Sequence, residues 1–173
     1  MRFVDLLKSA VLLSAGAATA LAVIAVLEAQ ELGYDLLVPI SAGWWLVAML
    51  LGGWLGRRRR PAAPVARALR DARTATTLPD LRPGRVLLAR LWPLLAATIG
   101  AAALSVAFPQ VASIAAGFAA IWALSWRHQD AAVSAIEERD GVTFHVASGS
   151  PLGPLRLVRT PGLRRELPAE PVG

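Results

Sequence analysis

One stretch of this chain is too long and too apolar for any soluble fold. The 36 residues from Leu91 to Trp126 include no Asp, Glu, Lys, Arg or His. About 20 apolar residues cross the hydrocarbon core of a bilayer, so this stretch predicts two membrane helices joined by a tight turn at residues 108–110. The chain is therefore predicted to be an integral membrane protein.

Two further apolar segments precede this stretch, which gives four predicted spans. They cover about residues 9–27, 36–56, 91–107 and 111–126. A secretory signal peptide is the alternative for the first segment, since Arg2 and Lys8 precede it and Ala18-Thr19-Ala20 resembles a cleavage site. The apolar residues continue past that site to Leu27, so an uncleaved helix is favoured.

The charged residues lie between these segments and set the orientation. The chain has 18 basic residues and a net charge of +6. All of the basic residues lie before the first span, between the second and third, or after the fourth, whereas residues 28–35 contain three acidic residues and no basic one. Positively charged loops stay cytoplasmic. Both termini and the 57–90 loop are therefore predicted to be cytoplasmic.

The predicted fold class is an all-α membrane protein, a four-transmembrane-helix bundle with a small cytoplasmic α/β tail. Residues 1–126 form the membrane domain and 127–173 the tail. Residues 130–139 extend the fourth helix and Gly141 ends it, and Glu137 and Glu138 are expected to be a solvated helix end. Alternating residues 142–146 and the segment 155–159 predict a β-hairpin, which needs a surface to dock on because two strands alone are marginally stable.

The 57–90 loop is predicted to contain a short helix from Pro64 to about Thr74, followed by a turn at 82–84. One face of this helix would be apolar, with Val65, Leu69 and Ala72. Another would be basic, with Arg67, Arg70 and Arg73. This arrangement is typical of a helix that lies in the headgroup layer.

The loop arginines are the predicted binding site for anionic phospholipid, because a juxtamembrane cluster of basic residues attracts such lipids. The predicted contacts are Arg57, Arg58, Arg59, Arg60, Arg67, Arg70, Arg73, Arg85 and Arg90. A topology anchor is the alternative for Arg57–Arg60. Nucleic acid is not an expected partner, since the loop has no aromatic residue for stacking.

Small residues at four-residue spacing predict close helix packing inside the bundle, in preference to oligomerisation. The candidates are Gly52 with Gly56, Ser113 with Gly117, and Gly16 with Ala20. Hydroxyl groups within the spans are expected to bond to helix carbonyls or to a neighbouring helix.

No residue set predicts catalysis, a cofactor or a metal site, and the chain is predicted not to be an enzyme. Cysteine is absent, and the two histidines, His128 and His145, lie in different elements; a metal needs more ligands than these. The predicted spans contain no ionisable residue, which argues against a proton-coupled transporter.

The predicted function is that of a non-catalytic interaction, scaffold or accessory subunit, with its basic loop on anionic phospholipid. It would act with a membrane-protein partner or as a homo-oligomer. The alternative is a small oligomeric channel or transporter component with a hydroxyl-lined path. The high arginine and alanine content indicates a GC-rich bacterial genome, so the predicted location is the bacterial cytoplasmic (inner) membrane.

Overall fold

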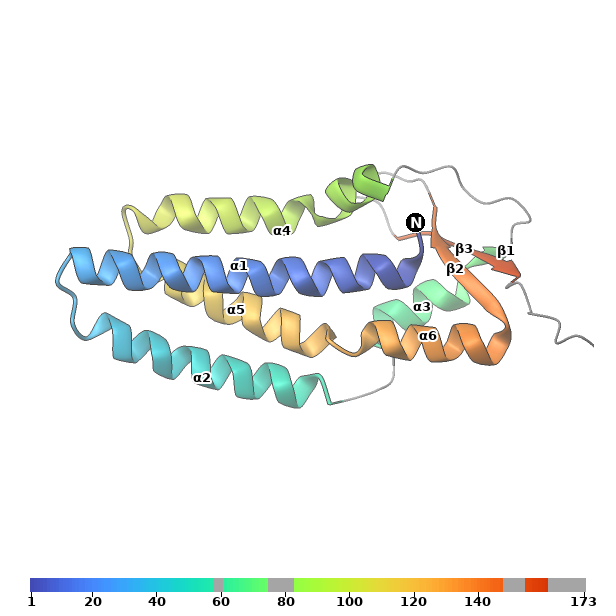
Figure 1. Ribbon diagram of the computed structural model, residues 1–173, viewed down its shortest axis with the longest axis horizontal. Coiled ribbons are helices and arrows are strands. Elements are labelled where there is room, and N and C mark those ends of the chain that lie inside the picture. The colour runs from blue at the N-terminus through green and yellow to red at the C-terminus, as the bar shows by residue number, and fades with distance from the viewer. Residues whose placement is uncertain (58–60, 75–82, 148–154, 162–173) are drawn as a thin grey trace, which may run out of the picture.

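A computed structural model describes residues 1–57, 61–74, 83–147 and 155–161 of the 173-residue chain. Four long apolar helices lie side by side: α1 (Phe3–Glu31), α2 (Leu37–Leu55), α4 (Pro83–Ser105) and α5 (Gln110–Trp126). A small group of strands lies at one end of these helices (Figure 1). We call this the sheet end, and the opposite end, where residues 32–36 and 106–109 connect the helices, the turn end.

Three of these helices are long and apolar enough to cross a membrane: α1, α2 and residues Gly84–Ser105 of α4. This finding indicates a multi-pass membrane protein, as the sequence predicted. The helix α5 has 17 residues, about 26 Å at 1.5 Å per residue, and is short against a hydrocarbon core of about 30 Å. Length and composition therefore support three crossings among the described residues, whereas the sequence predicted four.

Two predicted helix boundaries are wrong. The helix α1 extends from Phe3 to Glu31 instead of 9–27, because Lys8 and Glu28 are good helix formers and a helix can continue beyond the lipid. The helix α4 begins at Pro83 instead of near residue 91, so the turn predicted at 82–84 is absent from the described part. Proline is compatible with the first turn of a helix, where its missing N–H has no partner to lose.

The helix α5 is central to the bundle, since it packs against α1, α2 and α4. In the half of the bundle near the turn end, Leu21 and Ala25 of α1 pack on Ala112 and Ala116 of α5, and all four are at most 2% exposed. Alanine at such a contact lets two helix backbones approach closely.

The sheet end is built from short elements that come from two parts of the chain. The helix α3 (Ala63–Arg70) and the strand β1 (Arg73–Thr74) precede α4, while α6 (Gln129–Asp140), β2 (Val142–Val146) and β3 (Leu157–Pro161) follow α5. The strand order is β1-β3-β2, with β3 antiparallel to β2 and parallel to β1.

The predicted hairpin is confirmed, with Val142 paired to Pro161 at its open end. Gly141 ends α6 at φ 61°, a left-handed conformation that glycine adopts at little cost. The second strand begins two residues later than predicted, and the strand β1 was not predicted. The third strand gives the hairpin part of the support that two strands lack on their own.

The N-terminus covers the other edge of this sheet. Arg2 forms a β-bridge with His145, and the Val146 N–H donates a hydrogen bond to the Met1 carbonyl oxygen at 3.1 Å. The sheet, α6, α3 and the first turns of α1 and α4 then share one hydrophobic core. Its buried residues are Phe3, Val4, Leu6, Leu7, Val65, Val86, Val133, Phe144, Val146 and Leu157. The hairpin therefore docks on helices of its own chain, and this core draws on residues from both sides of position 126.

Candidate functional site

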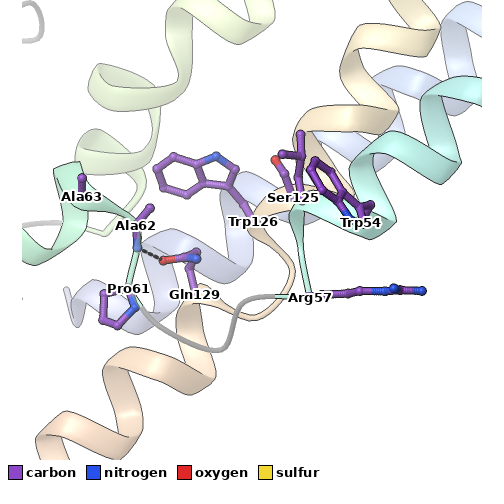
Figure 2. Close-up of a pocket in the computed structure, with 9 residues that line it drawn as sticks. Trp54, Arg57, Pro61, Ala62, Ala63, Ser125, Trp126 and Gln129 are labelled. Carbon is purple, nitrogen blue, oxygen red and sulfur yellow. Dashed lines mark hydrogen bonds between the residues drawn. The ribbon is translucent and has the colours of Figure 1, made fainter.

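At the sheet end, α2 leads into α3, and α5 leads into α6. Two consecutive side chains at the start of α6 hydrogen-bond to the backbone at the end of α2 and just before α3. His128 Nδ1 lies 2.8 Å from the Gly56 carbonyl oxygen, and the Ala62 N–H donates to Gln129 Oε1 at 2.8 Å (Figure 2). The carbonyls of a last helical turn lack intrahelical partners, so His128 also satisfies the end of α2.

A groove of about 740 Å³ opens between these four elements, and its lining includes Trp54, Arg57, Ser125, Trp126 and Gln129. We call it the Trp54–Trp126 groove. In Figure 2 the Trp126 ring lies near Ala62, Trp54 lies beside Ser125, and the Arg57 side chain extends away from Gln129. The groove thus combines aromatic walls with one cationic side chain that reaches outward.

The Trp126 ring is held in place from a second side. It stacks on Trp122, with ring centroids 5.5 Å apart and an interplanar angle of 10°. Trp126 also packs against the hydrophobic core of the sheet end. This wall of the groove is therefore fixed before any ligand enters, which lowers the entropy cost of binding.

The chemistry of the Trp54–Trp126 groove suits a phospholipid headgroup. Tryptophan favours the depth of the headgroups, and a guanidinium group binds phosphate through paired hydrogen bonds. A volume of about 740 Å³ lies within the usual range of ligand sites, about 300–1,000 Å³.

The structure separates the nine arginines that were predicted to bind lipid. Arg90 is half-buried, and the side chains of five others are exposed: Arg57, Arg67, Arg70, Arg73 and Arg85. Arg58, Arg59 and Arg60 lie outside the described residues. Arg57 directly follows α2, whereas Arg67 and Arg70 belong to α3 and Arg73 to β1.

The predicted helical row of Arg67, Arg70 and Arg73 is wrong. The helix α3 ends at Arg70, and Arg73 lies in β1, where it pairs with Val158 of β3. The apolar face of the helix is also used differently than predicted, since Val65, Leu69 and Ala72 pack in or against the core of the sheet end. A docking surface supplied by the chain itself therefore removes the reason for α3 to lie with this face in lipid.

Small residues form the contact between α2 and α5, as predicted. A Cβ atom at Gly52 would lie 2.9 Å from the Ile121 Cα, and one at Gly56 would meet the Leu124 carbonyl oxygen. On α5, the place of a Gly117 side chain is taken by the Trp44 ring. Ser113 Oγ donates to Ser41 Oγ at 2.6 Å, with both residues 4% exposed.

Gly16 and Ala20 do not pack inside the bundle, which corrects the prediction for this pair. Both are exposed, and no atom lies within 4 Å of the position that a Gly16 Cβ would take. Four-residue spacing identifies a small-residue face but does not say which neighbour, if any, covers it.

The indole N–H groups of two tryptophans also join α2 to α5. Trp44 donates to the Ile114 carbonyl oxygen at 3.3 Å and Trp45 to that of Ser113 at 3.0 Å. These hydrogen bonds place the polar atoms of both indole rings against α5.

The hydroxyl groups of the long helices bond within the bundle, as predicted. Ser14, Thr19, Thr98 and Ser125 each donate to a carbonyl oxygen three or four residues earlier, at 2.8–3.0 Å. Ser105 Oγ lies 2.7 Å from both the Ala102 carbonyl oxygen and Glu28 Oε1. No sequence pattern indicated this contact between α1 and α4, because it joins residues 77 positions apart.

Glu137 was expected in a solvated helix end and is instead buried. Its side chain is 6% exposed, and its two oxygens accept hydrogen bonds from the Phe144 N–H at 2.8 Å and from Arg2 Nη2 at 2.9 Å. A single carboxylate thus joins α6 to β2 and to the N-terminus. Glu137 follows the buried Val133 by four residues, on the same face of α6, and this spacing was the only sequence sign of its role.

The histidines lie apart, and the described residues contain no cluster of three or more His, Cys, Asp or Glu that could hold a metal ion. Thr160 Oγ1 lies 3.3 Å from His145 Nδ1. Burial, aided by the charge of the N-terminal ammonium group, lowers the pKa of His145 below its ordinary value. His145 is therefore neutral at pH 7 and serves the packing of the sheet.

Comparison with known protein families, curated proteins and solved structures found no match for this chain. The functional argument consequently depends on the geometry and charge of the sheet end.

Proposed function

We propose that this chain is a non-catalytic interaction platform in the bacterial cytoplasmic membrane, either as a homo-oligomer or as an accessory subunit of a membrane-protein complex. In this proposal α5 supplies a fourth crossing, and both termini and the sheet end are cytoplasmic. The observation that carries it is the sheet end itself, a folded and basic unit whose core includes the first turns of α1 and α4. A partner bound to this unit would be held at a fixed position relative to the membrane.

The charge distribution supports the orientation. Every basic residue that the structure describes lies in the half of the bundle near the sheet end or in the sheet end itself, whereas Glu28, Glu31 and Asp35 lie near the turn end. Positive segments remain on the cytoplasmic side during insertion. The short span of α5 is compatible with a crossing, since spans of about 17 residues occur.

In this proposal an anionic phospholipid binds in the Trp54–Trp126 groove, with its phosphate at Arg57, and Arg85 and Arg90 of α4 add positive charge in the headgroup layer. Each basic residue near an anionic surface contributes about 1 kcal/mol. The arginines of α3 and β1 are not part of this lipid site, because the apolar face that would hold α3 in the lipid packs on the protein.

Retention of lipid by the purified protein tests this proposal. Native mass spectrometry of the intact chain should show bound phosphatidylglycerol or cardiolipin in preference to phosphatidylcholine. The double variant Trp54→Ala/Arg57→Gln should lose this retention by about tenfold, which is the effect of one basic contact together with one interfacial aromatic.

A matched variant gives the control. Trp92→Ala/Arg67→Gln also removes one exposed tryptophan and one exposed arginine but leaves the groove intact, and it should retain lipid as the parent chain does. Equal retention by all three proteins would mean that the arginines serve only as a topology signal.

The hydroxyl pairing argues for a platform over the alternative of a small channel. Ser41 and Ser113 bond to each other, and five further hydroxyls of the long helices, those of Ser14, Thr19, Thr98, Ser105 and Ser125, bond to neighbouring carbonyls. A conducting path would need polar groups that can exchange partners with an ion or water. Reproducible currents in liposomes, abolished by Ser113→Leu, would favour the channel instead.

A further inference from the structure

A second groove lies at the sheet end, between α3 and α6. Its volume is about 550 Å³, and we call it the α3–α6 groove. Its apolar wall includes Leu69, Ile136 and Phe144, and its rim carries Arg70, Arg139 and Arg159. Among the described lining residues Asp140 is the one acidic residue, so these residues carry a net charge of +2.

The rim already shows how it binds a carboxylate. Arg139 Nε donates to Asp140 Oδ1 at 2.8 Å and Arg139 Nη2 to Asp140 Oδ2 at 3.3 Å. This hydrogen bonding lowers the pKa of Asp140 below its ordinary value, and the charge of Arg159 adds to the effect. Arg159 is therefore close enough to act on an acidic group in the same space.

The α3–α6 groove extends along α6 beyond the Trp54–Trp126 groove, and Pro61 is the one described residue that lines both. Ile136 follows Gln129, the first residue of α6, by seven residues, about 10 Å along this helix, and α6 leads away from the bundle (Figure 1). That distance exceeds the Debye length of about 8 Å at physiological salt. A ligand of the α3–α6 groove therefore comes from the aqueous side.

We propose that the α3–α6 groove binds an acidic segment of a partner protein, with apolar side chains against Leu69 and Ile136 and carboxylates on Arg70 and Arg159. The proposal rests on the platform function above and names the class of partner. An arginine rim around an apolar floor is complementary to such a segment in charge and in polarity. Asp71 and Glu138 are exposed neighbours of the rim but do not line the groove, so they leave the lining positive.

Fluorescence anisotropy on the full chain in neutral phosphatidylcholine nanodiscs provides the test. The probe is a labelled twelve-residue peptide of Glu, Asp, Leu and Phe, and its reference replaces every Glu and Asp by Gln and Asn. We expect saturable binding of the acidic probe, with a Kd of about 100 µM or tighter, that weakens at high salt. The neutral reference should bind at least tenfold more weakly, because it cannot use the rim.

Two charge-matched variants locate the binding. Arg70→Gln/Arg159→Gln should raise the Kd about tenfold, as expected for two partly exposed ion pairs. Arg67→Gln/Arg156→Gln changes two exposed arginines outside the groove and should change the Kd less than twofold. Both variants keep the core residues, and circular dichroism checks their fold.

Three results would overturn the proposal: no saturable binding to the parent chain, equal effects of the two variants, or a response only to anionic lipid in the nanodisc. If the probe binds only to the variant Glu166→Gln/Glu170→Gln, the chain's own C-terminal acidic residues occupy the groove in the parent protein. This result would also contradict the proposal that a partner protein binds there. If the acidic peptide does not bind but the purified protein still retains anionic lipid through Trp54 and Arg57, the proposed platform function is not contradicted. The two measurements use different residues, so the failure of one is distinguishable from the failure of the other.

Discussion

At the scale of single residues, Glu137 joins three separate segments: α6, β2 and the N-terminus. Its carboxylate is 6% exposed and accepts hydrogen bonds from Arg2 and from the Phe144 N–H. A buried donor that loses its acceptor costs about 1–3 kcal/mol. Arg2 is 54% exposed and can hydrogen-bond to water if the Glu137 carboxylate is removed. Most of the free-energy cost would therefore come from the unpaired Phe144 N–H.

We predict that Glu137→Ala lowers the free energy of unfolding of the sheet end by about 2 kcal/mol, because the Phe144 N–H stays buried without a partner. Glu138→Ala is the matched control, since Glu138 is exposed in the same helical turn, and it should change stability by less than about 0.5 kcal/mol. Denaturant unfolding followed by tryptophan fluorescence measures both. Equal stability of the two variants would show that Glu137 is not a structural link.

At the scale of elements, the packing of α2 on α5 depends on where glycine removes a side chain. Gly52 lies against Ile121 and Leu124, while the next residue, Gly53, has no atom within 4 Å of its Cβ position. We predict that Gly52→Ala destabilises the bundle by about 1–3 kcal/mol through overpacking. Gly53→Ala should be neutral or stabilising by up to about 1 kcal/mol, because alanine is the better helix former.

Unfolding in mixed micelles of increasing SDS fraction compares these two glycine variants in one detergent system. The order of the midpoints, with Gly53→Ala above Gly52→Ala, is the result that the α2–α5 contact requires. A Gly52→Ala midpoint equal to that of Gly53→Ala would mean that the two helices do not approach as closely as the structure has them.

The same elements show what the sequence could predict. Long uncharged segments require helices in lipid, and alternation with a glycine stop predicted the β2–β3 hairpin correctly. The strand β1 was missed because it is two residues long and its partner is β3, more than 80 positions away. The apolar face of α3 was recognised, but periodicity alone does not say whether lipid or protein covers it.

The candidate site residues also divide into those that local sequence spacing predicts and those that depend on partners distant in the sequence. Gly52, Gly56, Ser113 and Gly117 were predicted by spacing and confirmed at one interface, whereas the exposed pair Gly16 and Ala20 has the same spacing. The Trp54–Trp126 groove depends on four elements that meet only in three dimensions, and the link from Arg2 to Glu137 spans 135 positions. No local pattern carries such information.

At the scale of the whole molecule, the account depends on the side of the membrane that the sheet end occupies. The chain has no cysteine, so single cysteines report their surroundings without background labelling. Tyr34 is 53% exposed near the turn end, and Arg67 and Arg139 are exposed at the sheet end. Tyr34→Cys, Arg67→Cys and Arg139→Cys therefore sample both ends and both halves of the chain.

The most direct test is labelling of these three variants with a membrane-impermeant maleimide in intact bacterial cells. The account predicts that position 34 is labelled in intact cells and that positions 67 and 139 are labelled only after permeabilisation. Labelling of position 139 from outside, with position 67 protected, would mean an odd number of crossings after the loop. It would contradict a cytoplasmic platform.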